Sequence, residues 1–360
     1  MVAVIMVHWC GIYWGAREAV ASYIHAPVIE GPPSSMSRWL DIPTFNYGPF
    51  GVSIFFLISG FVIPFSLART APLKFLVARF LRIYPTYIVA SFTMLLLVYL
   101  SSRYWGQSYT LSLSNLVANL TLVQENLSIP SIDLVNWTLS IEIKFYLVAA
   151  LLYMAIRKGN PLPIIFYAVL VLAFCSVPTS LWPPGLTSVI SIDSLKTELM
   201  YTVFMFVGTG FYHHYTGDHS GRQLFQYCAV LLVIFMLCWP RTSWVGPTSD
   251  VPQNYMYGLL TFGVSYLFRD KFRPIWPLDF LANISYSVYV LHSIIGYLSI
   301  RILMDQGCTF PVAGLLTLIF VLVLAYGLHV LVERPTMHMG KNLFKTKVAP
   351  PDAIATVAQP

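Results

Sequence analysis

The stretch GPFGVSIFFLISGFVIPFSL, residues 48–67, carries no charged side chain over a length that suits one crossing of a lipid bilayer. Backbone amides cannot stay unpaired in hydrocarbon, so such a run is predicted to be a helix. Similar runs recur along the chain, and we predict ten transmembrane helices at 1–16, 50–68, 83–101, 139–156, 163–181, 197–215, 224–243, 252–268, 284–303 and 311–333. The predicted fold class is an all-α polytopic membrane helix bundle.

The composition excludes an ordinary soluble protein. Hydrophobic residues make up 57% of the 360 positions and charged residues 10%, whereas soluble domains carry about 25% charged residues. We predict one membrane domain over residues 1–340. Residues 341–360, which end in a stretch rich in Pro, Ala and Val, are predicted to form a disordered cytoplasmic tail.

The basic residues indicate topology. The net charge of +6 is spread over short loops rather than one patch, so nucleic acid is not expected as a partner. If the N-terminus is inside, 14 of the 21 Lys and Arg residues fall on inner segments and 6 on outer loops. Cytoplasmic loops are enriched in Lys and Arg, so we predict that both termini are cytoplasmic. The longest connections, 17–49 and 102–138, are then outer loops that can grip a large substrate.

Neither a metal site nor a disulfide framework is expected. The five cysteines are widely spaced and mostly inside apolar runs, which indicates packing. His213, His214 and His219 match no closed zinc pattern and are predicted to lie in a solvated loop.

Ionisable residues inside the predicted helices call for a reason, because each costs about 2.5–3.5 kcal/mol near the bilayer centre. His8 lies in the apolar segment MVAVIMVHWCG, where an imidazole can serve as a general base. Its alternative role is a structural hydrogen bond to a neighbouring helix. Glu142, in NWTLSIEIKFYL, shares a helical face with Tyr146, and Trp137 lies at the interface. Lys144 is two positions from Glu142 and cannot face it, so Glu142 needs a partner from another helix.

Two further segments contain candidate donor-binding residues. Ser59 and Gly60 either permit close helix packing or thin the wall of an internal pocket. Arg79 and Arg82, in FLVARFLRIYPTY, are three apart and share one helical face. They either obey the topology rule or hold the phosphate groups of a cytosolic donor, which guanidinium geometry suits.

A polar stripe marks the ninth predicted helix. In NISYSVYVLHS, Ser285, Tyr289 and His292 are spaced at i, i+4 and i+7, which predicts a face turned toward an internal cavity. The tenth helix is predicted to close at VERP, where Pro335 stops it.

The motifs GVSIFFLISGF, ARFLRIYP, WTLSIEIKFY, ISYSVYVLH and VERP, in this order after His8, resemble those of the acyltransferase-3 family of multi-spanning membrane acyltransferases. The resemblance runs from His8 to about Pro335. It implies transfer of an acyl group, usually acetyl, from cytosolic acyl-CoA to a hydroxyl of a saccharide or glycoconjugate. It also implies a bacterial cytoplasmic (inner) membrane and no permanently bound cofactor.

By motif matching, His8 corresponds to the essential histidine of the family. We expect His8 and Glu142 to be catalytic, with Glu142 orienting the imidazole. The expected donor-binding residues are Arg79, Arg82, Ser59 and Gly60, and the expected substrate-binding residues are Trp137, Tyr146, Tyr289 and His292. In this hypothesis the thioester reaches from the arginines to His8, which accepts the proton of the acceptor hydroxyl or briefly carries the acyl group.

One feature departs from the family pattern. The family's first helix opens with an arginine that precedes the essential histidine. The matching position in this sequence would fall before Met1, so this arginine has no counterpart here. The first helix also falls short of the roughly 20 residues needed to span, so we expect either that the true start lies upstream or that this member has lost part of its donor site. Two alternative functions remain: a transporter or flippase of a lipid-linked sugar, and a relay that passes the acyl group to a separate extracytoplasmic transferase.

Overall fold

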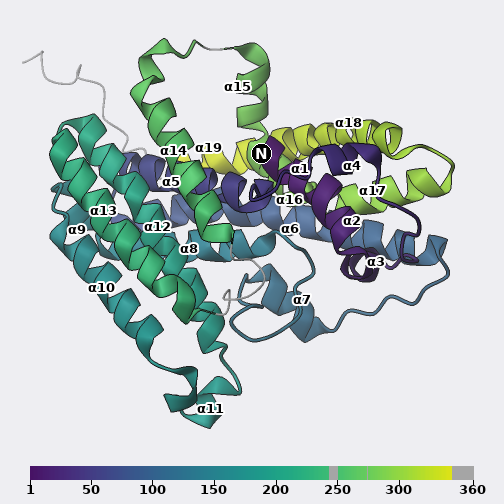
Figure 1. The fold of residues 1–360 in the computed structure, drawn as a ribbon, viewed down its shortest axis with the longest axis horizontal. Helices are drawn as coiled ribbons and strands as arrows, with labels where there is room; N and C mark the ends of the chain where they lie inside the picture. The colour runs from purple at the N-terminus through teal and green to yellow at the C-terminus, as the bar shows by residue number, and fades with distance from the viewer. Residues whose placement is uncertain (243–249, 274, 343–360) are drawn as a thin grey trace, which may run out of the picture.

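The computed structural model describes residues 1–242, 250–273 and 275–342, and within them it contains helices and no strand (Figure 1). Each of the ten predicted ranges is helical, so the all-α class is confirmed. The main helices are α1 (Val2–Met6) with the π-helical η1 (Val7–Ile12) and α2 (Tyr13–Gly15), α5 (Tyr47–Leu67), α6 (Pro72–Tyr104), α8 (Asn136–Leu151) with α9 (Tyr153–Arg157), α10 (Leu162–Ser176), α12 (Ile192–Thr216), α13 (Gly221–Cys238), α14 (Val251–Leu267), α16 (Ser285–Leu291) with α17 (Ile294–Asp305), and α18 (Phe310–Leu328) with the π-helical η5 (His329–Glu333) and α19 (Arg334–Asn342).

Shorter helices occupy the connections. They are α3 (Arg17–Ile24), α4 (Ser35–Trp39), α7 (Leu113–Leu120), α11 (Pro184–Thr187) and α15 (Trp276–Asn283), with the 3₁₀ turns η2 (Thr179–Leu181), η3 (Trp239–Arg241) and η4 (Arg269–Lys271).

Four helices of the described chain are long and apolar enough to cross a membrane: Tyr47–Leu67, Pro72–Tyr104, Gly221–Arg241 and Phe310–Gly340. The pair Ser285–Leu291 and Ile294–Asp305 would make a fifth span, bent by 60°. The chain is thus a membrane protein, while the count of ten spans and the orientation of the termini remain predictions. The other helices are shorter or more polar, and Val2–Gly15 and Leu162–Ser176 are the shorter apolar ones.

Several predicted boundaries differ from the structure. The third helix begins at Pro72 rather than 83, because a proline is tolerated in the first turn of a helix. The helix then continues through Pro85. The ninth is interrupted after Leu291. Helix α19 continues past Pro335, which was predicted to stop it, and ends at Asn342. The predicted tail, 341–360, therefore begins inside a helix, and its remaining residues lie outside the described part of the chain.

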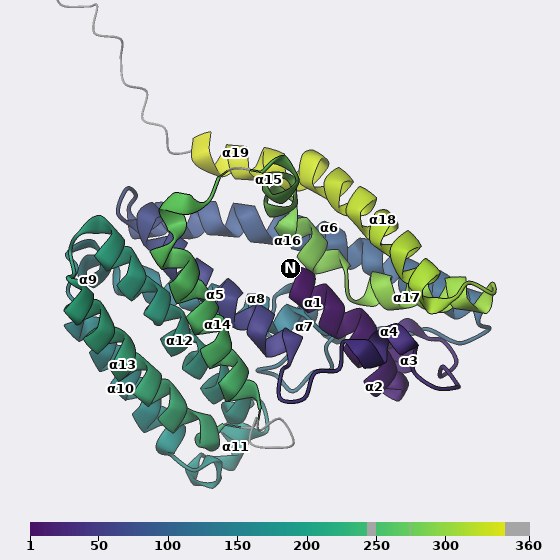
Figure 2. The ribbon, with the colours of Figure 1, turned by 45° about the horizontal axis from the view of Figure 1, so that its top comes forward.

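The helices enclose two hydrophobic cores at opposite ends of the molecule (Figure 2). One core lies among α5, α8, α10, α12, α13 and α14, and the other among the first helical stretch, α6, α16, α17 and α18. The rings of Tyr84 and Tyr286 pack against both cores.

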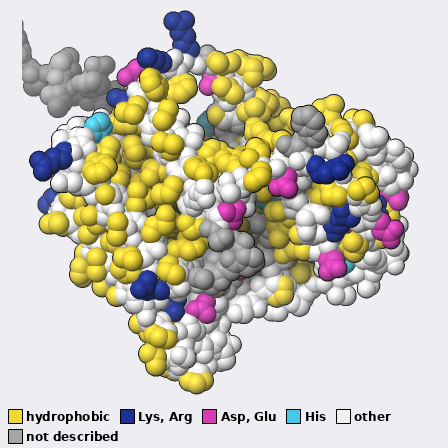
Figure 3. All heavy atoms as spheres, viewed as in Figure 1, with side chains coloured by type: hydrophobic (Ala, Val, Ile, Leu, Met, Phe, Trp, Pro, Cys, Tyr) yellow, Lys and Arg dark blue, Asp and Glu magenta, His cyan; other side chains and the backbone are white. Residues whose placement is uncertain are grey.

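An apolar surface covers α13 and α14 on the face drawn in Figure 3, and the charged side chains lie toward its margins. Exposed side chains on these helices include Phe225, Val233, Leu260 and Leu267. A water-soluble protein rarely exposes so broad an apolar patch, whereas helices that face lipid do so by necessity. This surface agrees with the membrane assignment.

Candidate active site

His8 lies on the π-helical turn η1 of the first helical stretch and is buried against α17. Its Nδ1 atom is 2.5 Å from the hydroxyl oxygen of Tyr297. The ring of His292 meets the His8 ring edge-on, with 5.0 Å between the centroids. Single π-helical turns inside α-helices are frequent at functional sites. The structure therefore brings the His8 ring together with two polar rings from a distant part of the sequence, those of His292 and Tyr297.

His292 lies at the break between α16 and α17, where the helix axis bends by 60°. The break frees the His292 carbonyl oxygen, which accepts a hydrogen bond from Trp9 Nε1 at 2.9 Å. The imidazole Nδ1 is 2.7 Å from the carbonyl oxygen of Tyr289. A carbonyl oxygen only accepts hydrogen bonds, so Nδ1 carries the proton and Nε2 keeps its lone pair. That Nε2 atom is buried and has no hydrogen-bond partner among the described residues.

Tyr289 connects this histidine pair to α8 and α5. Its hydroxyl lies 2.5 Å from Thr138 Oγ1 and 3.2 Å from the Val135 carbonyl oxygen. Its ring stacks on Phe55, with 6.0 Å between centroids and 7° between planes. Of the predicted stripe, Tyr289 and His292 are in ring contact, whereas Ser285 is half-buried and donates its hydroxyl to the Ala282 carbonyl oxygen of α15. The hydroxyl of Ser285 is thus directed to α15 rather than to the histidine pair.

Asp133, in the loop before α8, holds the helix break from the other side. The Ser293 hydroxyl donates to Asp133 Oδ1, and the Leu134 backbone N–H donates to the same atom at 2.6 Å. Burial raises the pKa of the Asp133 carboxyl to about 6, although these hydrogen bonds act in the opposite direction. The Asp133 carboxylate therefore holds Ser293, the residue that follows His292, in place.

A second polar cluster surrounds Glu142. The Ser59 hydroxyl donates to Glu142 Oε1 at 3.2 Å, and the Tyr146 hydroxyl donates to the same oxygen. The partner on another helix that the spacing required is thus Ser59 of α5. The Arg79 guanidinium lies over the ring of Tyr146, 5.7 Å from its centroid. Arg79 and Arg82 both lie within electrostatic range of Glu142.

The Glu142 cluster has an excess of positive charge. The guanidinium groups of Arg79 and Arg82 share the one carboxylate of Glu142. A half-buried surplus cation favours an anionic ligand, because solvent screens it poorly. A groove of about 330 Å³ runs beside Arg79 and Tyr146 between α6 and α8, and apolar side chains such as Leu76, Phe80 and Ile143 line it.

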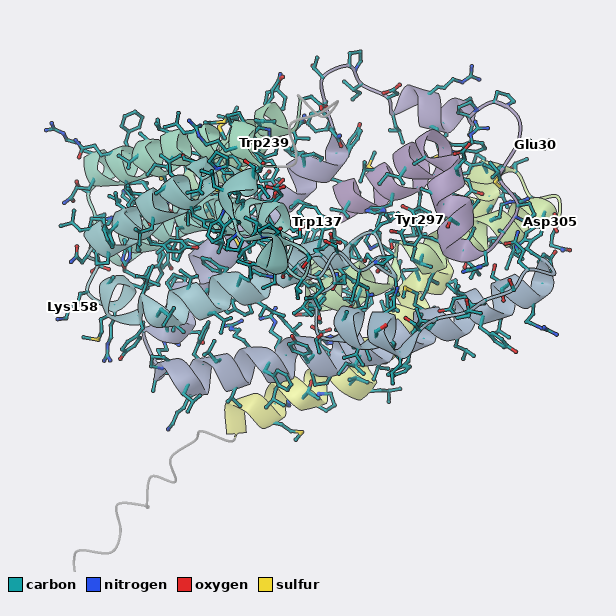
Figure 4. All side chains as sticks on the ribbon, turned by 90° about the horizontal axis from the view of Figure 1, so that it is seen from below. Glu30, Trp137, Lys158, Trp239, Tyr297 and Asp305 are labelled. Carbon is teal, nitrogen blue, oxygen red and sulfur yellow. The ribbon has the colours of Figure 1, made fainter. Side chains whose placement is uncertain are left out.

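Gly60 and Trp137, two predicted binding residues, face the core around α12. A Cβ atom at Gly60 would come within 1.8 Å of the Met205 carbonyl oxygen, so this glycine allows α5 and α12 to cross closely. The ring of Trp137 packs against Tyr201 of α12. Figure 4 shows Trp137 in the middle of the molecule, between Tyr297 and Trp239.

The predicted pairing of Glu142 with His8 does not match these contacts. The hydrogen bonds of Glu142 go to Ser59 and Tyr146, and that of the His8 ring goes to Tyr297. The physical reason is helix rotation: the face of α8 that carries Glu142 turns toward α5 and α6, whereas His8 turns toward α17. The residue that holds the imidazole is a tyrosine that sequence reasoning did not single out.

Sequence reasoning also missed a buried ion pair. Lys144 Nζ lies 3.0 Å from Glu198 Oε1, and Ser140 and Asn126 complete the hydrogen bonds of both groups. A lysine and a glutamate in separate apolar helices were the available signal. For Tyr297 no signal existed, because a tyrosine in an apolar helix is ordinary.

The histidines of residues 213–219 are not a solvated loop. His213 and His219 are buried, and they bond to Asp218 and to the Gly159 carbonyl oxygen. His213 belongs to α12, which ends at Thr216, so it lies within the helix predicted at 197–215. The described residues contain no group of three His, Cys, Asp or Glu side chains placed to hold a metal ion.

A large cleft of about 1060 Å³ lies beside the first helical stretch. Val7, Cys10 and Gly11 line one wall, next to the turn that holds His8, and residues 40–47 line the other. Arg38, Asp41 and Asp250 supply charged groups. The cleft thus lies over the segment 17–49, which was predicted to grip substrate.

The comparisons with known proteins identify the family of the chain. A sequence model of the acyltransferase domain, Acyl_transf_3, matches residues 1–330. The chain therefore belongs to the acyltransferase-3 family, and its class is a membrane acyltransferase. No curated protein and no solved structure matches the chain.

Proposed function

We propose that the protein transfers an acyl group, most simply acetyl, from cytosolic acyl-CoA to a hydroxyl of a saccharide or glycoconjugate. The observation that supports this proposal best is the buried contact of His8 with Tyr297 and His292. An apolar residue would fill this space at lower cost in hydrocarbon. A polar constellation at a π-helical turn and a helix break is instead suited to proton transfer.

The proposed chemistry uses the free nitrogen of His8. When His8 Nδ1–H donates to the Tyr297 oxygen, Nε2 keeps its lone pair and accepts the proton of the acceptor hydroxyl. The acceptor oxygen attacks the thioester carbonyl, the carbon–sulfur bond breaks, and the CoA thiolate takes the proton from the imidazolium. His292 Nε2, which has no partner, is a second proton acceptor next to His8.

The donor is proposed to bind at the Glu142 cluster. Arg79 and Arg82 provide surplus positive charge for phosphate oxygens. The apolar groove beside Arg79 suits the pantetheine arm and the acyl chain. Glu142 with Ser59 and Tyr146 positions the arginines, so in this proposal Glu142 acts on the donor side rather than on the imidazole.

The acceptor is proposed to enter through the cleft beside the first helical stretch, whose volume of about 1060 Å³ accommodates several sugar rings. With the predicted topology, donor and acceptor reach His8 from opposite faces of a bacterial cytoplasmic membrane. Tyr289 lies between the two polar clusters, since it contacts His292 and is within electrostatic range of Glu142.

The break between α16 and α17 favours the transporter alternative, because broken helices with polar centres also form transport sites. Here, however, Trp9 and Asp133 occupy the polar groups of the break. Membrane vesicles from the expressing cells, supplied with acetyl-CoA labelled in the acetyl group, separate the alternatives. Transfer of label to the vesicle glycans supports the enzyme. Label that stays on CoA in vesicles containing folded protein contradicts it.

The role of His8 is tested in the same vesicles. The change His8→Ala should reduce transfer by about 10²–10⁴-fold, the usual contribution of a general base. The control is His214→Ala, since His214 bonds to Tyr266 at the far end of α12. Transfer by folded His8→Ala protein at the parental rate would reject the mechanism.

A further inference from the structure

Two cysteines that the sequence predicts to be separate packing residues lie together in the structure. Cys175 is near the end of α10, and Cys238 is the last residue of α13. The hydrogen bond of Cys175 Sγ goes to the Lys196 carbonyl oxygen at 3.8 Å, and the Cys238 thiol lies close enough to Cys175 for the two thiols to interact. Both side chains are buried in the same core, with 3% and 0% of their surface exposed.

The two helices bring the cysteines to one end of the bundle. Helices α10 and α13 are in contact and lie side by side in Figures 1 and 2. Arg157 and Lys158 precede α10, and Arg222 is in the first turn of α13. The cysteines are therefore at the opposite end of each helix, where Lys196 and Arg241 are the neighbouring basic residues.

The position of the basic residues indicates the compartment that the thiols face. Cytoplasmic loops are enriched in Lys and Arg, and in the predicted topology, with 14 basic residues inside and 6 outside, the cysteine ends of α10 and α13 are extracytoplasmic. Disulfides form and persist in that compartment and are rare in the cytosol. A thiol pair in contact at this end is thus in the right environment to be oxidised.

We propose that Cys175 and Cys238 form a disulfide that ties α10 to α13. The reaction joins the two sulfur atoms, and a protein disulfide of the extracytoplasmic compartment takes up the two electrons and two protons to become a dithiol. This bond does not depend on the proposed acyl transfer.

The disulfide would brace the helix that both of its anchors contact. Helix α12 packs against α10 and α13, and on its other side it crosses α5 at Gly60. Because the finished core seals both sulfur atoms, exchange takes place during insertion, before α10 and α13 close against each other. Reductants should then reach the bond only after the protein unfolds.

The experiment blocks free thiols with N-ethylmaleimide while cells are harvested and the membranes denatured. The protein is then purified, reduced and labelled with iodoacetamide. We expect maleimide on Cys10, Cys228 and Cys308, and iodoacetamide on Cys175 and Cys238. A peptide pair joined through these two residues should appear before reduction and disappear after it. Omitting the denaturant during a mild reduction should leave the pair intact.

Two variants control the assignment. In Cys175→Ser, Cys238 should become a maleimide target, whereas Cys308→Ser should leave the linked pair unchanged. Maleimide on both Cys175 and Cys238 of the parent protein overturns the proposal. A linked pair that appears only after copper phenanthroline oxidation also overturns it, since the contact would then be real but unoxidised in the cell.

Discussion

The Nδ1 atom of His8 lies 2.5 Å from the hydroxyl oxygen of Tyr297, and this contact joins two residues 289 positions apart. It sets which imidazole nitrogen is left for chemistry, because the nitrogen that is already bonded cannot also receive a proton from a substrate. The contact therefore makes Tyr297 a positioning residue for the proposed base.

Removing the Tyr297 hydroxyl should slow the reaction without weakening substrate binding. Tyr297→Phe keeps the ring and loses one hydrogen bond to a group that becomes charged, which is worth about 1.5–3 kcal/mol. The expected result is a fall in kcat of about 10- to 150-fold, with KM for both substrates within about twofold.

Tyr13→Phe is the matched control for this prediction. The Tyr13 ring stacks on Tyr297, but its hydroxyl contacts only the Met304 sulfur, at 3.7 Å. This variant should keep the parental kcat. A Tyr297→Phe protein that does the same would show that the contact is structural.

The surplus charge at the Glu142 cluster predicts a donor-specific defect. Arg79→Gln removes a guanidinium that is proposed to bind phosphate, and a charge-assisted hydrogen bond is worth about 1.5–3 kcal/mol. We expect KM for acyl-CoA to rise by about 10-fold or more, while KM for the acceptor is unchanged. Initial-rate kinetics in vesicles measure both constants.

Arg157→Gln is the control for Arg79. Arg157 also stacks on a tyrosine, Tyr153, but lies exposed on α9. Its substitution should leave both KM values unchanged. An equal rise in the acceptor KM of Arg79→Gln would contradict a donor-specific role.

The close crossing of α5 and α12 predicts a loss of stability. Gly60→Ala places a methyl group 1.8 Å from the Met205 carbonyl oxygen, and overpacking of this kind costs about 1–3 kcal/mol. Its melting temperature in detergent should fall by several degrees. Gly263→Ala, where nothing lies within 4 Å, should be neutral or stabilising because alanine favours the helix. Equal melting temperatures for the two variants would contradict the close contact of α5 with α12 at Gly60.

Asp133 predicts how stability depends on pH. Its pKa of about 6 in the fold exceeds the ordinary value of 3.8, so the native state holds this proton more tightly than the unfolded chain. The contribution of Asp133 to the free energy of unfolding should therefore fall as pH rises from about 4 to 6, by at most about 3 kcal/mol, and stay level above.

Asp133→Asn should remove this fall, because the amide oxygen still accepts the hydrogen bonds from Ser293 and Leu134 but does not ionise. Melting curves at pH 5 and pH 7.5 should then differ less for the variant than for the parent. Asp270→Asn, at an exposed position, is the control and should behave as the parent does. A parental pH dependence in Asp133→Asn would reject the assignment.

The sequence by itself determined the helical class and the places of the ten helical ranges, because an apolar run without charges has no other way to satisfy its backbone in lipid. Its motifs also identified the family and most residues of the two polar clusters. The tertiary structure alone decided how those residues pair. It set His8 against Tyr297 and His292, turned Glu142 toward Ser59 and the arginines, and brought Cys175 and Cys238 into one core. Hydropathy specifies that a helix forms, whereas its rotation and tilt depend on packing against helices remote in the sequence.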